Sequence, residues 1–233
     1  MLWYTVLATH ITIICITIYL HRSQTHNGVS LHVALSHFMR FWLWLTTGTV
    51  TKEWVATHRK HHRYSDQAGD PHSPYPIGIK RFLIRSASLY QFKTKPSQQI
   101  LDQYGSGTPN DWIEQNLYSK YPRAGLILFT MVNLFLFSWW GLLVTFLVIW
   151  FPSFGAAGIV NGLGHWWGYK NKETNDHSRN ILPLGILIGG EELHNNHHID
   201  SKNPKFSKRW FEVDIGWMWI NIFKALGLIQ LKK

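Results

Sequence analysis

The histidines of this chain are concentrated in four short stretches that lie far apart in the sequence. Nine of the fourteen histidines fall in these stretches, which are HRSQTH, HRKHH, NGLGH and HNNHH. Neutral imidazole is the most common side-chain ligand for metals of intermediate softness. One tetrahedral zinc ion uses three or four protein ligands, so nine clustered histidines favour two metal ions in one histidine-lined pocket. Such a pocket requires all four stretches to meet, which strongly constrains the fold.

Two of the stretches repeat the same spacing, with histidines at positions i, i+3 and i+4. On a helix, this spacing places three imidazoles on one face within about one turn. One helix could therefore supply ligands to two adjacent metals, and a solvated basic helix face is the alternative. The candidate histidine ligands are His21, His26, His58, His61, His62, His165, His194, His197 and His198.

The other two stretches are less regular. His21 and His26 are five residues apart, and a regular α-helix would point them about 140° from each other. We expect them either to serve different metals or to lie where a helix frays. Asn161 stands four residues before His165, and we expect it to hold a metal-bound water, with a capping or packing role as the alternative. The histidines outside the pattern are expected to be structural; they are His10, His32, His37, His72 and His177.

Carboxylates are scarce around these histidines, which narrows the metal chemistry. Di-iron carboxylate bundles need two Glu-x-x-His motifs, and only Glu191 with His194 forms one here. The zinc-protease motif HExxH is absent. Four nearby carboxylates are expected to accept N–H bonds from ligand imidazoles, with a solvated surface position as the alternative: Asp66, Asp70, Glu191 and Glu192. A histidine-rich site of this kind suits iron that activates O2.

Long apolar runs predict membrane helices in a single domain covering residues 1–233. Residues 124–169, a run of 46, contain no Lys, Arg, Asp or Glu, and one span needs about 20 apolar residues. We expect a two-span hairpin over about 124–160 with its turn near 138–141, and another span over about 2–20, read as retained structure and not as a signal peptide. Residues 31–50 carry His32, His37 and Arg40, which are costly at mid-bilayer, so a re-entrant or interfacial segment is expected there.

The basic residues suggest an orientation. The net charge is +10, and 21 of the 23 Lys and Arg residues lie in residues 52–123 or after residue 169, the segments that also hold most of the histidines. Basic segments flanking spans indicate the cytoplasmic face. Anionic lipid headgroups, an acidic carrier or an acidic electron donor are favoured as partners, and nucleic acid is not. The single cysteine excludes a disulfide framework. Residues 206–231 are expected to form an amphipathic, Trp-rich helical region.

The histidine stretches in their wider context resemble a known family. HRSQTH, HRKHHRYSDQAGDPHSP, NGLGHWWGY and GGEELHNNHH are similar to the membrane-bound Δ9-type fatty-acyl desaturases, with the similarity running from about Thr9 to Gly227. The resemblance implies an all-α integral membrane bundle with a cytosolic helical cap. It also implies two irons held by the nine histidines, with Asn161 binding one iron through water. The implied reaction uses O2 and two electrons to remove two hydrogens from adjacent methylenes, leaving a cis double bond.

The resemblance also implies partners and a location. The substrate would be a fatty-acyl chain carried by CoA, a carrier protein or a phospholipid. The chain has no HPGG-type haem motif, so electrons would come from a separate ferredoxin, rubredoxin or cytochrome b5 with its reductase. The protein would be a multi-pass membrane protein, in the inner membrane if bacterial, with its site on the cytoplasmic face. Twenty residues precede His21, whereas family members usually have more. A di-iron lipid or alkane hydroxylase and a non-enzymatic membrane metal-binding protein are the alternative functions.

Overall fold

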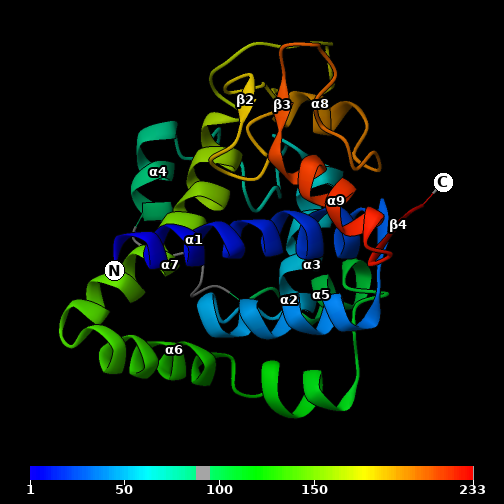
Figure 1. The fold of residues 1–233 in the computed structure, drawn as a ribbon. Helices are drawn as coiled ribbons and strands as arrows, with labels where there is room; N and C mark the ends of the chain where they lie inside the picture. The colour runs from blue at the N-terminus through cyan, green and yellow to red at the C-terminus, as the bar shows by residue number, and fades with distance from the viewer. Residues whose placement is uncertain (88–94, 233) are drawn as a thin grey trace.

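The computed structural model describes residues 1–87 and 95–232, and this part of the chain is mostly helical (Figure 1). The α-helices are α1 (Leu2–Cys15), α2 (Val33–Thr46), α3 (Thr51–Tyr64), α4 (Ile79–Ala87), α5 (Gln98–Tyr104), α6 (Pro122–Phe137), α7 (Trp140–Phe154), α8 (His194–Ile199) and α9 (Ile215–Ala225). The π-helices are η1 (Ile16–Thr25), η3 (Glu114–Tyr118) and η4 (Gly155–Leu163). The expectation of a helical protein is correct, and two small sheets are additional. In these sheets β1 (Val29–Leu31) pairs antiparallel with β4 (Ile229–Leu231), and β2 (Leu184–Gly185) pairs parallel with β3 (Val213–Asp214).

Two long helices combine an α-helix with a π-helix. α1 continues into η1 and α7 into η4, and each combined helix has 24 residues and is apolar enough to cross a membrane. The outer ends of α1 and α7 expose aromatic side chains, with Trp3 82% and Trp140 64% accessible. The opposite end of each long helix leads into a histidine stretch. The apolar surface and the histidines are therefore separated along these helices.

α6 and α7 form a helical hairpin. The chain reverses at Ser138 and Trp139, within the expected turn, and Ser138 has a left-handed φ of 53°. The two helices pack closely because Gly141 has no side chain; a Cβ there would lie 2.2 Å from the Asn133 carbonyl oxygen. Inside the hairpin the amide of Asn133 donates to Thr145 Oγ1 and accepts from the Tyr4 hydroxyl. α6 itself is 16 residues long, shorter than the roughly 20 residues of a typical span.

The segment expected to be re-entrant forms α2, which packs against α1 and α6. Its Arg40 is buried, and the structure shows how the charge is accommodated. The guanidinium makes two hydrogen bonds to Asp111 and one to Glu114, at 2.6 to 3.0 Å. Planar, charge-assisted pairing of this kind offsets the cost of burying the guanidinium.

The C-terminal expectation is wrong in part. A helical region was expected over 206–231, but the helix α9 covers only Ile215–Ala225. The start of α9 is set by Asp214, whose carboxylate accepts a hydrogen bond from the Trp217 amide as an N-cap. The chain leaves the helix at Gly227, which has a left-handed φ of 73°, and β4 then pairs with β1. Local capping and strand pairing therefore override the amphipathic pattern.

Candidate metal centre

All nine histidines singled out in the sequence lie together in two adjacent groups. Within each group the ligand atoms lie within 4.8 Å of one another. The five-histidine group consists of His21, His26, His58, His62 and His197. The four-histidine group consists of His61, His165, His194 and His198. The groups touch, because the His62 and His198 rings stack with centroids 4.4 Å apart. Four remote stretches thus form one centre with two potential metal positions.

The i, i+3, i+4 spacing divides each helix between the two groups. On α3, His58 and His62 belong to the five-histidine group, while His61 belongs to the four-histidine group. On α8 the division is reversed, with His197 in the first group and His194 and His198 in the second. Residues four apart on a helix differ by about 40° in direction, whereas adjacent residues differ by about 100°. The spacing therefore lets one helix serve two positions, as the sequence predicted.

The sequence did not predict that His21 and His26 would belong to the same group. The helix around them is a π-helix, shown by the hydrogen bond from the His26 amide to the His21 carbonyl five residues earlier, at 3.1 Å. At about 4.4 residues per turn, residues five apart point within roughly 50° of each other. Their ring centroids are 4.8 Å apart. The expectation that they serve different metal positions was wrong because it assumed a regular α-helix, whereas the alternative of an irregular helix end is closer, since η1 ends at Thr25.

Four ligand candidates are fixed by carboxylates. In the four-histidine group, His61 Nδ1 donates to Asp70 at 2.9 Å, His165 Nδ1 to Asp66 at 2.8 Å and His198 Nδ1 to Asp176 at 2.7 Å. In the five-histidine group, His21 Nδ1 donates to Glu191 at 2.8 Å. An ionised carboxylate can accept hydrogen bonds but cannot donate them. Each of these rings therefore carries its proton on Nδ1. The lone pair is then left on Nε2, which is the usual arrangement of histidine beside a metal.

The Nε2 atoms converge in both groups. His194 Nε2 lies 2.9 Å from His165 Nε2, and His197 Nε2 lies 3.0 Å from both His21 Nε2 and His62 Nε2. The Nε2 atoms of His61 and His198 are buried without a hydrogen-bond partner among the described residues. Imidazole nitrogens about 2.1 Å from one ion lie about 3.0 Å apart at right angles and about 3.4 Å apart in a tetrahedron. The donor set therefore fits two metal ions.

Burial favours the neutral form of His58 and His62 on α3 and of the three histidines of α8. Loss of hydration, followed by repulsion from neighbouring histidines, puts the pKa of His58 and His62 well below the usual 6.5. Burial also lowers the pKa of His198 to about 4, although Asp176 opposes the change. For Asp66 and Asp70, burial would raise the pKa, but hydrogen bonds from His165 and His61 outweigh it and the pKa of each carboxyl is lowered. Neutral imidazoles and ionised carboxylates are the protonation states that metal binding requires.

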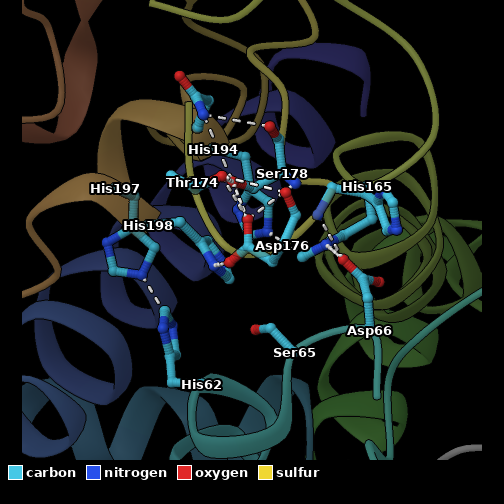
Figure 2. A network of polar contacts seen from close by, with 12 residues as sticks. His62, Ser65, Asp66, His165, Thr174, Asp176, Ser178, His194, His197 and His198 are labelled. Carbon is cyan, nitrogen blue, oxygen red and sulfur yellow. Dashed lines mark hydrogen bonds and ion pairs between the residues drawn. The ribbon is translucent and has the colours of Figure 1, made fainter. Parts of the chain in front are cut away.

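The Asp66 and Asp70 carboxylates are brought to the site by the loop after α3. Asp66 adopts a left-handed φ of 62°, and its backbone amide donates to Asp70 Oδ2. Its side chain also accepts hydrogen bonds from Ser73 and from the His177 amide. Aspartate is one of the few residues that tolerate this backbone conformation. Figure 2 shows the Asp66 carboxylate directed at His165.

The expected role of Glu192 was wrong. Its carboxylate touches no imidazole but accepts hydrogen bonds from the backbone amides of Leu187, Ile188 and Gly190. Glu191 faces the site and Glu192 faces this loop, since adjacent residues point in different directions. Asp66, Asp70 and Glu191 contact imidazoles as expected.

Asp176 was missed by the sequence analysis. Its Oδ2 accepts from His198, while its Oδ1 accepts from Thr174, from Ser178 Oγ and from the Ser178 amide (Figure 2). The residue belongs to a loop 22 positions from His198, where no spacing rule applies. The available signal was the polar sequence TNDHS, which is typical of a turn that hydrogen-bonds to itself.

The structure also places Asn161 and His72, two other residues near the histidine stretches that the sequence singled out. Asn161 is buried near the end of η4, four residues before His165, and its role toward a metal-bound water stays a prediction. His72 was expected to be structural, but its ring lies 5.8 Å from that of His61, and its Nδ1 is buried without a partner among the described residues. It therefore lies at the edge of the four-histidine group.

Comparison with known proteins agrees with this geometry. A family model described as "Fatty acid desaturase" matches residues 1–211. The chain belongs to the fatty acid desaturase family. A "Delta-9 desaturase-like 2 protein" of Arabidopsis thaliana is 31% identical over 94% of this chain and 72% of its own length. The "Delta-9 acyl-lipid desaturase 2" of the same plant is 29% identical over 97% of this chain and 73% of its own length. An "sn-1 stearoyl-lipid 9-desaturase" of Synechocystis is 31% identical over 92% of this chain and 66% of its own length.

Membership of the desaturase family makes the chain an oxidoreductase of lipid metabolism. The two histidine groups are the part of the structure that could hold metal ions. They lie within the region matched by the family model, because the last of the nine histidines is His198.

Proposed function

We propose that the protein converts a saturated fatty-acyl chain into a cis-monounsaturated chain, in a Δ9-type reaction that uses O2 at a histidine-ligated di-iron centre. The observation that carries the proposal is the convergence of nine histidines, most of them buried, into two touching groups inside a chain of the desaturase family. The Δ9 position follows the names of the relatives, which are desaturases of this type.

The donor set supports iron more than structural zinc. Five histidines in one group exceed the four ligands of a structural zinc site. The Nε2 separations of 2.9 to 3.1 Å match ligands at right angles, as in five- or six-coordinate ions, better than a tetrahedron. Imidazole-rich sites with open positions suit iron that reacts with O2, and two irons held here would supply O2 activation and electron transfer.

The atoms and electrons of the reaction balance with one outside source of electrons. Two adjacent methylenes lose two hydrogens, which supply two electrons and two protons. An external donor supplies two more electrons, solvent supplies two more protons, and O2 is reduced to two waters. The alkene retains no oxygen atom. A separate electron-carrier protein is therefore part of the proposed system.

The protein's own groups hold and shield the centre. Asp66, Asp70, Asp176 and Glu191 keep protons on Nδ1, so the Nε2 lone pairs face inward. His61, His165, His194 and His197 are fully buried, which limits the access of bulk water and protects a reactive centre from side reactions.

We also propose that the chain is a multi-pass membrane protein with the centre at the cytoplasmic face, in the inner membrane if the source is bacterial. The apolar helices α1–η1 and α7–η4 support this, as do the exposed apolar side chains of α6, such as Phe135 at 89% accessible. Acyl chains would then reach the centre from the bilayer, whether CoA, a carrier protein or a phospholipid carries them.

Lipid analysis tests the proposal. Expression in a host that lacks its own synthesis of unsaturated fatty acids should produce cis-monoenoic chains, seen by mass spectrometry with double-bond localisation. Purified protein should contain about two irons per chain, and labelled O2 should leave no label in the lipid product. Labelled alcohol would instead indicate a hydroxylase, and iron-loaded protein that oxidises no acyl lipid with any carrier would contradict the proposal.

A further inference from the structure

A basic surface lies directly outside the five-histidine group. The chain between α8 and β3 contains Lys202, Lys205, Lys208 and Arg209, all exposed, followed by Trp210, which is 94% accessible. We call residues 202–210 the basic segment. Asp200 offsets one of these charges, with its carboxylate 3.9 Å from Lys208 Nζ. In Figure 1 the chain from α8 to β3 lies on the opposite side of the molecule from α6, which carries strongly exposed apolar side chains such as Phe135.

The basic segment has one buried residue, and that residue touches the candidate ligands. Phe206 is 1% accessible, and its ring centroid lies 4.7 Å from that of His197 and 5.7 Å from that of His21. The Arg22 guanidinium lies over the same ring at 3.8 Å. A single aromatic side chain thus separates the backbone beside exposed Lys205 from two imidazoles of the five-histidine group.

The segment is held rigidly. The Phe206 amide donates to Asp214 at 2.8 Å, and the Phe206 carbonyl accepts from Asn196 Nδ2 at 2.9 Å. The amides of Lys208 and Arg209 both donate to Glu212. A fixed surface loses little conformational freedom when a partner docks on it.

An exposed basic segment joined by one aromatic ring to the five-histidine group suits electron transfer from another protein. We propose that the basic segment docks an acidic one-electron carrier protein and that Phe206 is the contact through which electrons enter the five-histidine group. This inference rests on the proposed function, which needs two electrons from an outside protein. Each docked carrier gives one electron, so that it is oxidised by one unit while one ferric ion becomes ferrous. Tunnelling falls steeply with distance, and a ring in contact with two ligands shortens the path.

The charge and position of the segment favour a protein partner over lipid. Four cations within eight residues attract an acidic surface and raise the association rate at low salt. Anionic lipid would attract the same charges, but the segment lies across the molecule from α6. An exposed tryptophan beside cations is also typical of protein–protein contact centres.

A charge-reversal experiment tests the docking. The iron-loaded protein in detergent is mixed anaerobically with reduced [2Fe–2S] ferredoxin of negative net charge, and reduction of the ferric centre is followed by stopped flow. In the variant Lys202→Glu, Lys205→Glu, Lys208→Glu, the second-order rate should fall about tenfold or more at low salt, with a weaker dependence on ionic strength. The matched control, with the same change in charge, is Lys80→Glu, Arg81→Glu, Lys120→Glu on exposed positions elsewhere.

The route through Phe206 has its own readout. Phe206→Leu should lower the reduction rate at saturating ferredoxin by about tenfold without changing ferredoxin affinity, and Phe206→Tyr should restore the rate. Reduction by photogenerated deazaflavin, which needs no docking surface, should proceed alike in the wild type and the lysine variant. Iron content and absorption spectra establish that each variant keeps its centre.

The outcomes separate the docking proposal from the proposed function. Equal rates for the two triple variants, or loss of binding only to phosphatidylserine vesicles in the lysine variant, would overturn the docking proposal. A protein that holds no reducible iron would overturn the proposed function. In that case ferredoxin binding to the wild type and to the lysine variant, measured by surface plasmon resonance on the purified protein, would still decide the docking.

Discussion

The two histidine groups are built differently, although they share two helices. The four-histidine group anchors three of its four rings to aspartates, while the five-histidine group has one carboxylate partner for five rings. The five-histidine group relies more on ring packing, with Trp54 stacked on His58 at 4.9 Å and Phe206 against His197 at 4.7 Å.

This difference concerns how a metal would be held. Carboxylates fix the tautomer and raise the basicity of a ligand imidazole, so the four-histidine group is preorganised with fewer ligands. The five-histidine group offers one more ligand with less orientation. We therefore expect the metal of the four-histidine group to be the slower to leave under chelation, and the metal of the five-histidine group to be the more readily exchanged.

The largest effects should follow from removing one imidazole from either group. His61→Ala should reduce the iron content of the four-histidine group and His197→Ala that of the five-histidine group, and each should abolish turnover because both positions are needed. Iron analysis should give about one iron per chain in each variant, and product analysis should show no alkene. His37→Ala, outside both groups, is the control. Full activity in His61→Ala would show that this ring does not ligate iron.

A carboxylate comparison should give the next largest effect. Glu191→Gln and Glu192→Gln change neighbouring residues in the same way, but only Glu191 touches an imidazole. We expect Glu191→Gln to weaken metal binding by the five-histidine group about 10–100-fold and Glu192→Gln to leave it within about threefold. Competition with a coloured chelator measures both. Similar losses in the two variants would mean that the carboxylates act only on the fold.

Asp176→Asn extends the same test to the four-histidine group. The amide can still accept from Ser178 and Thr174 but no longer carries the charge that faces His198. We expect a loss of metal affinity of about 10–100-fold that is confined to the four-histidine group. In a chelation experiment, the iron that leaves the wild type slowly should leave this variant fast. Loss of both irons at equal rates would contradict the separation of the two groups.

Acid should destabilise the metal-free protein. Burial puts the pKa of His58, His62, His194 and His197 well below 6.5 and that of His198 at about 4. The unfolded chain, with ordinary pKa values near 6.5, then binds protons that the folded chain does not. The contribution of these histidines to the free energy of unfolding is therefore fully present above about pH 6.5. It decreases as the pH falls from about 6.5 toward 4, by up to about 1.4 kcal/mol per pH unit for each such histidine. Thermal unfolding in detergent at several pH values measures this, and a flat midpoint would contradict it.

The sequence predicted which histidines come together better than it predicted the side chains that support them. Six of the nine histidines were recognisable because imidazoles at i, i+3 and i+4 on a helix share a face, and α3 and α8 do divide their rings as that spacing requires. Asp176 was not recognisable, because a loop residue is brought to His198 by tertiary contacts that leave no periodic pattern. Glu192 was misjudged because nearness in sequence to a histidine stretch does not determine where a side chain points.

The backbone conformation was harder to predict from the sequence than the positions of the side chains. The π-helix that brings His21 beside His26 depends on backbone hydrogen bonds five residues apart, such as that from the His26 amide to the His21 carbonyl at 3.1 Å, and composition does not determine it. The limits of α9 depend on the Asp214 cap and on pairing of β1 with β4, a contact between residues about 200 positions apart. Apolar runs located the long helices, since a continuous apolar stretch is a signal read directly from the residues.

The smallest expected effect concerns the ring packing of the five-histidine group. Trp54→Leu removes the indole stacked on His58 with ring planes 12° apart, an interaction of about 0.5–1.5 kcal/mol. Iron in the five-histidine group should therefore leave about two- to tenfold faster under chelation, while the four-histidine group, which Trp54 does not orient, should keep its rate. Trp219→Leu on α9, away from both groups, is the matched control. If Trp54→Leu made iron leave faster from the four-histidine group alone, the indole would not support the five-histidine group. The proposed contrast between ring packing in one group and carboxylate anchoring in the other would then be wrong.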